Sequence, residues 1–227
     1  MTTVRDALES QREAEREFVE TAQRTETAPK GWPAALVMFH ISTWRELMRN
    51  ALTEFAERGA FAPPPEGIDE FNDARLPDGI GTPLADAAAR ADLLLREIIE
   101  LYTRIGERPF LWYGAQDTTE AVLRNSYTHP RLHLFEYCKE NGERERALTL
   151  WEQARTDIEA ASGPPRIVGA VLYNLACAKV PLGQIDDAVE LLGRSFGMRP
   201  DLKAEARDDA DLAPLLEDPR FRALLND

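Results

Sequence analysis

The helical spacing of the apolar residues constrains this chain more than any other feature of its sequence. Apolar residues recur at steps of three and four along almost the whole chain, and no segment alternates at period two for long enough to predict a strand. Hydrophobic residues make up 44% of the 227 residues, which is enough for a sizeable buried core. We therefore predict an all-α protein.

Proline and glycine mark the expected helix boundaries. Pro33 suits the first turn of a helix, Gly59 suits a helix end, and Thr82 suits an N-cap. A polar linker over 25–31, a long ordered loop over 60–82 and an aromatic-rich connection over 108–114 separate the first helices. We expect helices over residues 2–22, 33–59, 83–106, 117–125, 128–141, 143–161, 167–182, 185–197 and 210–225.

The second half contains an internal repeat with an offset of 41 residues. Leu134, Gly142, Ala147 and Trp151 have these counterparts: Leu175, Gly183, Ala188 and Leu192. We expect glycine at each helix–helix turn and alanine at each close crossing, because bulk at either place would separate the helices. The pattern resembles the tetratricopeptide helix pair, whose usual period is about 34. Two copies are fewer than normally stand alone, so we expect the repeats over 128–227 to pack on the first half or on a second chain.

Charge and composition exclude several classes of protein. The net charge is −13 and no basic stripe is present, so we expect neither nucleic acid nor an anionic membrane as a partner. No apolar run is long enough to span a bilayer, and the N-terminal residues are charged throughout. The two cysteines, Cys138 and Cys177, do not form a disulfide framework, and we expect them to pack as small hydrophobic residues. These features predict a cytoplasmic protein.

The three histidines of the chain are candidate metal ligands. His129 and His133 are four residues apart, so they lie on one side of a helix if both are helical, and His40 lies on an apolar stripe. Three imidazoles that converge inside a bundle would bind a divalent transition metal, with Zn or Ni preferred, and leave one position open. Two alternatives stay open: His40 as a satisfied core residue, and His129 as a helix cap before Pro130.

Two segments resemble the DinB-like four-helix bundles. GWPAALVMFHISTW resembles the second helix of that family, and NSYTHPRLHLFEY resembles the start of its fourth helix; the loop PPEGIDEFND resembles a connection found in one branch. The resemblance covers residues 1–141 and implies that His40, His129 and His133 are metal ligands. Residues 128–141 would then serve both as the fourth bundle helix and as the first helix of the repeats.

The resemblance implies a metal-dependent hydrolase or thiol S-transferase that acts on a small electrophilic substrate. The alternative is a non-catalytic interaction module in which the repeats bind a protein partner, and a third hypothesis is a structural homodimer. In the first case we expect two groups to surround the site. The loop would supply an amide or carboxylate from Asp69, Glu70, Asn72 or Asp73, and the aromatic residues Trp44, Trp112, Tyr113 and Tyr127 would line a pocket.

Overall fold

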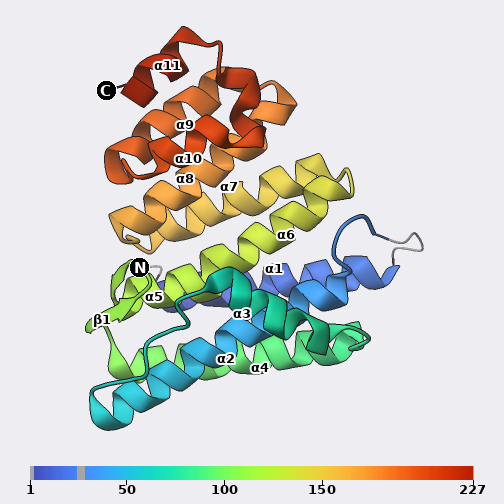
Figure 1. Ribbon diagram of the computed structural model, residues 1–227, viewed down its shortest axis with the longest axis vertical. Helices are drawn as coiled ribbons and strands as arrows, with labels where there is room; N and C mark the ends of the chain where they lie inside the picture. The colour runs from blue at the N-terminus through green and yellow to red at the C-terminus, as the bar shows by residue number, and fades with distance from the viewer. Residues whose placement is uncertain (1–2, 25–28, 227) are drawn as a thin grey trace.

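The computed structural model describes residues 3–24 and 29–226, and these form an all-α protein (Figure 1). The predicted linker over 25–31 lies largely outside the described residues. The α-helices are α1 (Val4–Arg24), α2 (Ala34–Arg58), α3 (Ile68–Arg75), α4 (Leu84–Ile105), α5 (Thr118–Leu123), α6 (His129–Glu140), α7 (Arg144–Ala160), α8 (Pro165–Lys179), α9 (Ile185–Met198), α10 (Leu202–Asp208) and α11 (Pro219–Asn226).

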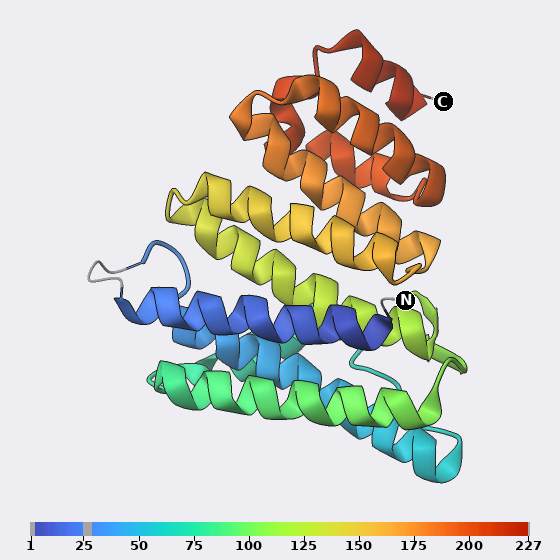
Figure 2. The same ribbon diagram turned by 180° about the vertical axis from the view of Figure 1, so that it is seen from behind.

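Four long helices pack together in the first part of the molecule. Helix α4 contacts α1 and α2, and α6 contacts the same two helices from the other side. Figure 2 shows α1 lying between α4 and the pair formed by α6 and α7. Helix α4 buries one stripe, which includes Ala87, Ala91, Leu95 and Ile98, as its apolar spacing predicts.

Helix α6 also belongs to the second half of the molecule. It packs against α7, which packs against α8, which packs against α9, so that the helices form a stack (Figure 1). The largest hydrophobic cluster runs without interruption from Ala7 in α1 to Leu225 in α11. The two halves are therefore joined through a shared helix and a shared core.

The repeat predicted from the sequence has a matching backbone structure. Gly142 and Gly183 have φ angles of 80° and 74°, and each lies at the turn between two helices. In each turn the residue after the glycine donates a hydrogen bond to the carbonyl five positions earlier, from Glu143 to Cys138 and from Gln184 to Lys179. The reason given above for glycine is wrong, because a Cβ on either residue would meet nothing within 4 Å. Glycine is needed for its left-handed backbone and not for close packing.

The prediction that the connection over 108–114 contains no strand is wrong, because this segment includes one strand of a short β-hairpin. Strands β1 (Pro109–Trp112) and β2 (Ala115–Asp117) pair antiparallel, with Tyr113 at a φ of 45° in the turn. Four and three residues are too few for alternation to be detected in the sequence.

Three further boundaries differ from the prediction. The loop over 60–82 contains α3 and a 3₁₀ turn over 76–79. Helix α4 begins after Pro83 without a side-chain cap, so Thr82 is not the N-cap. The helix predicted over 210–225 is a 3₁₀ turn over 210–215 followed by α11, because Pro214 and Pro219 interrupt an α-helix. Among the described residues, no helix is both long and apolar enough to span a membrane.

Candidate metal centre

The structure brings the three predicted histidines together between α2 and α6. The Nε2 atom of His129 lies 3.2 Å from Nε2 of His40 and 2.9 Å from Nε2 of His133. The candidate ligand atoms of all three residues lie within 4.8 Å of one another. His40 is buried on the apolar side of α2, while His129 and His133 are partly buried.

Hydrogen bonds between the imidazoles cannot satisfy this arrangement. A neutral imidazole nitrogen either donates one proton or accepts through one lone pair in the ring plane, whereas Nε2 of His129 faces two other ring nitrogens. A tetrahedral zinc site with Zn–N distances of about 2.05 Å places its nitrogens about 3.3 Å apart. Both separations from His129 are close to that value, so the three histidines could hold one metal ion.

Burial keeps the imidazoles neutral. It lowers the pKa of His40 to about 3, with a further contribution from His133, and lowers the pKa of His133 to about 4. The pKa of His129 is also well below its usual value, first because of burial and then because of the other two histidines. Neutral imidazoles have a free lone pair, which is the form that binds a metal.

A π-helical turn over Arg124–Thr128 connects α5 to α6 and places His129 inside a continuous helix. The φ and ψ angles of His129 are −62° and −48°, and its N–H donates to the carbonyl of Arg124, five residues earlier. The alternative in which His129 caps a helix that starts at Pro130 is therefore wrong. Because the wider turn replaces the α-helical pattern ahead of Pro130, the helix continues through the proline.

The same turn orients the ring of His129. In the π-helical pattern the carbonyl of Asn125 would accept from residue 130, but proline has no N–H. The imidazole of His129 forms a hydrogen bond with the backbone of Asn125, and this bond raises the pKa of the imidazole, as donation to a carbonyl does. Since Nε2 faces the other histidines, the opposite ring nitrogen is the donor. This contact leaves the Nε2 lone pair free for a metal.

An aromatic pocket of about 300 Å³ opens beside the histidines. Trp32 stacks on His133 with ring centroids 5.9 Å apart, and Trp44 meets His129 edge to face. Trp112 and Tyr113 complete the aromatic part of the wall. Trp44, Trp112 and Tyr113 therefore line a pocket as predicted, and Trp32 is an additional member that contacts two of the three histidines.

Tyr127, the fourth aromatic residue predicted for the pocket, lies elsewhere. It is fully buried, and its hydroxyl donates to Asp157 on α7 at 2.8 Å. Two positions separate Tyr127 from His129, and in a helix that spacing turns the side chain to the opposite side. The prediction for Tyr127 is wrong for this reason.

The segment over 60–82 supplies an amide to the pocket. Asn72 lines it and accepts a hydrogen bond from the indole of Trp44 at 3.0 Å, while Phe71 packs on the same ring. Asp69, Glu70 and Asp73 are exposed and line no part of this pocket. Of the four loop residues predicted, only Asn72 reaches the site.

A buried ion pair lies beneath the centre and was not predicted. Arg45 has no solvent exposure and binds Glu15 of α1 through both terminal nitrogens, at 2.8 and 2.5 Å. It also donates to the carbonyl of Ser126 in the π-helical turn, so it connects α1 and α2 to the turn that holds His129. The signal was available, because Arg45 falls between Ile41 and Met48 on the apolar stripe of α2.

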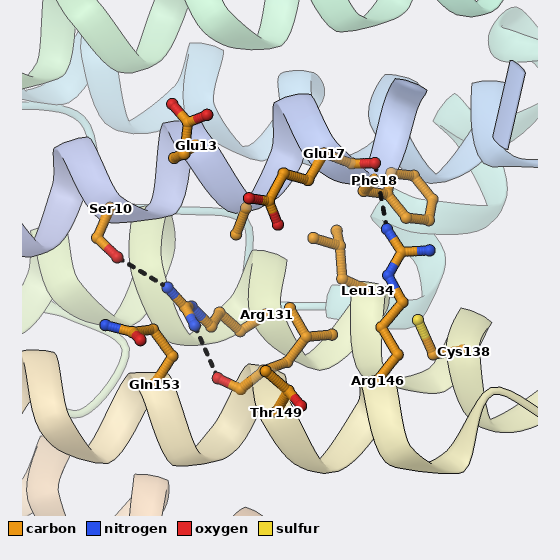
Figure 3. A pocket seen from close by; sticks show the side chains of 12 residues that line it. Ser10, Glu13, Glu17, Phe18, Arg131, Leu134, Cys138, Arg146, Thr149 and Gln153 are labelled. Carbon is orange, nitrogen blue, oxygen red and sulfur yellow. Dashed lines mark hydrogen bonds between the residues drawn. The ribbon is translucent and has the colours of Figure 1, made fainter. Parts of the chain in front are cut away.

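A second polar cluster lies on the other side of α6, beside a groove of about 360 Å³ between α1 and α7 (Figure 3). Arg131 is its centre and donates to the Gln11 side chain, the Leu150 carbonyl, Ser10 and Asp157. We call these residues the Arg131 cluster. Each nitrogen of its guanidinium has an acceptor within the protein.

Both cysteines are buried, as predicted. Cys138 lines the groove beside the Arg131 cluster, away from the histidines, and burial raises the pKa of its thiol to about 12. Burial also raises the pKa of Cys177. Neither thiol is available as an ionised nucleophile or ligand.

No known protein family, curated protein or solved structure matches this chain.

Proposed function

We propose that this protein binds one divalent transition metal ion through His40, His129 and His133, with Zn or Ni preferred, and uses it for catalysis as a DinB-like enzyme. The observation that carries the proposal is the convergence of three Nε2 atoms, at 3.2 and 2.9 Å about His129. Three neutral imidazoles are the ligand set of an open catalytic site, because a fourth position remains for a water or substrate.

The surroundings of the centre support catalysis more than a structural metal. A structural site closes its coordination with a fourth protein ligand, whereas the only group of three or more metal-binding side chains among the described residues is the histidine set itself. A pocket large enough for a small molecule adjoins it. A bound cation would supply Lewis-acid activation of a water or thiol, which suits a hydrolase or a thiol S-transferase acting on a small electrophile.

The residues around the histidines have separate tasks in this proposal. Asn125 holds the ring of His129, and Trp32 stacks on His133. The aromatic wall excludes water from the substrate, and Asn72 stands at the pocket as a neutral hydrogen-bonding group. Because His129 and His133 lie on one helix and His40 on another, the packing of α2 on α6 sets the ligand geometry.

Elemental analysis of tag-free protein tests the proposal. We expect about one equivalent of zinc or nickel after loading and dialysis, and loss of that metal in His133→Ala. Cys138→Ser removes a soft donor on the same helix, from a side chain that faces the groove between α1 and α7. The metal content of this variant should therefore match that of the wild type. Less than 0.1 equivalent after loading, or equal metal content in His133→Ala, would contradict the proposal. Either outcome would favour the alternative, an interaction module whose repeats bind a protein partner.

A further inference from the structure

One arginine lines the aromatic pocket and two more lie near it, in a protein whose net charge is −13. Arg124, at the start of the π-helical turn, lines the pocket and lies over the ring of Tyr113 at 5.8 Å. Arg166 from α8 and Arg199 beyond α9 are close enough to Arg124 that, after burial, they are the main causes of its lowered pKa.

Of these three arginines, only Arg199 forms a salt bridge within the described residues. Arg199 is paired with Asp201 through its Nε and one terminal nitrogen. Neither Arg124 nor Arg166 forms a salt bridge with any described residue, although this chain has 40 acidic side chains. Asp201, the partner of Arg199, also acts electrostatically on Arg166, while the guanidinium groups of Arg124 and Arg166 keep N–H groups that a bound anion would accept from.

The hairpin turn brings the two free guanidinium groups to the same place. A Cβ built on Gly114 would lie 3.3 Å from a terminal nitrogen of Arg166 and 3.4 Å from one of Arg124. The neighbouring residue, Tyr113, has the unusual φ of 45° and points its ring into the pocket wall. The turn between β1 and β2 therefore positions both a cationic pair and an aromatic surface.

We propose that the aromatic pocket binds a small aromatic carboxylate, with the carboxylate held by Arg124 and Arg166 and the apolar body against Trp44, Trp112 and Tyr113. This inference rests on the proposed function, since it names the substrate class of that site. The planar guanidinium matches a carboxylate, and a ring fits between the aromatic side chains. The bundle supplies the histidines and Arg124, which line the pocket, while the repeats supply Arg166, which lies outside that lining and meets Arg124 at Gly114.

Binding of 1-naphthylacetate, compared with the neutral 1-naphthylacetamide, tests this inference by titration calorimetry. The two probes differ in charge but share the aromatic body. We expect the wild type to bind the acid about tenfold more tightly than the amide, the gain typical of one charge-assisted hydrogen-bonded pair. Arg124→Gln should reduce the affinity for the acid about tenfold and leave the affinity for the amide unchanged. Arg16→Gln, at an exposed arginine of α1, is the control and should change neither.

Gly114→Ala gives a second test that keeps every charge. The added methyl group would contact both guanidinium groups, so the affinity for the acid should fall about threefold while the affinity for the amide stays the same. Equal binding of acid and amide by the wild type, or a preference for the acid that survives in the Arg124→Gln, Arg166→Gln double variant, would overturn the inference.

Measurements on metal-free and on zinc-loaded protein separate this inference from the proposed function. A preference for the acid in both forms that depends on Arg124 supports the inference. A preference that appears only with zinc and is unchanged by Arg124→Gln overturns it while leaving the metal centre in place. Absence of zinc binding contradicts the proposed function. The inference is then tested on the metal-free protein, by comparing the binding of the acid and the amide to the same variants.

Discussion

Helix α6 separates two buried polar clusters that differ in whether the protein satisfies them. On one side the Arg131 cluster gives every guanidinium nitrogen an acceptor, and Asp157 accepts from Ser10, Tyr127 and Gln153 as well. On the other side three neutral imidazoles direct Nε2 atoms at one another. The same helix thus presents a complete hydrogen-bond network and an incomplete one.

The difference indicates what each cluster is for. A buried polar network that is fully paired fixes how helices pack, and here it links α1, α6 and α7 across the junction of the two halves. In our proposal, the buried cluster whose lone pairs lack a common donor is completed by a bound metal ion. Stability should therefore depend on the Arg131 cluster in all conditions, and on the histidines only when metal is present.

The largest effect is expected from Arg131→Leu. The change leaves Asp157 without its cationic partner, and breaking a buried ion pair costs about 3 kcal/mol of unfolding free energy. Urea denaturation measures this loss. Arg144→Leu, the same change at an exposed position of α7, should alter stability by about 0.5 kcal/mol or less. A loss below about 1 kcal/mol for Arg131→Leu would remove the distinction between the clusters.

Zinc should stabilise the wild type and not His40→Ala. At a free zinc concentration of 100 times Kd, binding to the folded state adds about 2.7 kcal/mol to the unfolding free energy. Removing one of three ligands abolishes tight binding and with it that gain. Urea titrations with zinc and with a chelator measure the effect, and an equal gain in both proteins would show that His40 is not a ligand.

Tyr127→Phe sharpens the comparison with a smaller effect. It removes one hydrogen bond to Asp157 while the other donors remain, so the expected loss is about 1 kcal/mol. Zinc affinity should be unchanged, because Tyr127 lies on the side of α6 away from the histidines. Altered zinc affinity would mean that the two clusters are coupled through the helix.

Periodicity predicted the long helices because each buries a continuous stripe, and it also placed the three histidines on facing helices. It did not predict the π-helical turn, because a single wide turn of five residues is too short to change the 3.6-residue period of the apolar residues. The glycine repeat was visible because both positions require the same left-handed backbone.

Side-chain partners between distant segments were the part that the sequence did not reveal. Glu15 and Arg45 are thirty residues apart, and only the crossing of α1 and α2 makes them an ion pair. Arg124 and Arg166 meet at Gly114 because a hairpin too short for pattern analysis folds between them. Such contacts depend on the tertiary arrangement, whereas the histidine pair at a spacing of four is local to one helix.

The π-helical turn also determines which side chains ahead of α6 lie on the same side as His129. Residues five apart in an α-helix point about 140° away from each other, but the wider turn brings Arg124 and His129 to the same side. Loss of one codon within 124–128 would leave the arginine four residues before the histidine, and in an α-helix that spacing again places both side chains on one side. The π-helical turn thus accommodates one extra residue between Arg124 and His129 without moving either side chain away from the pocket.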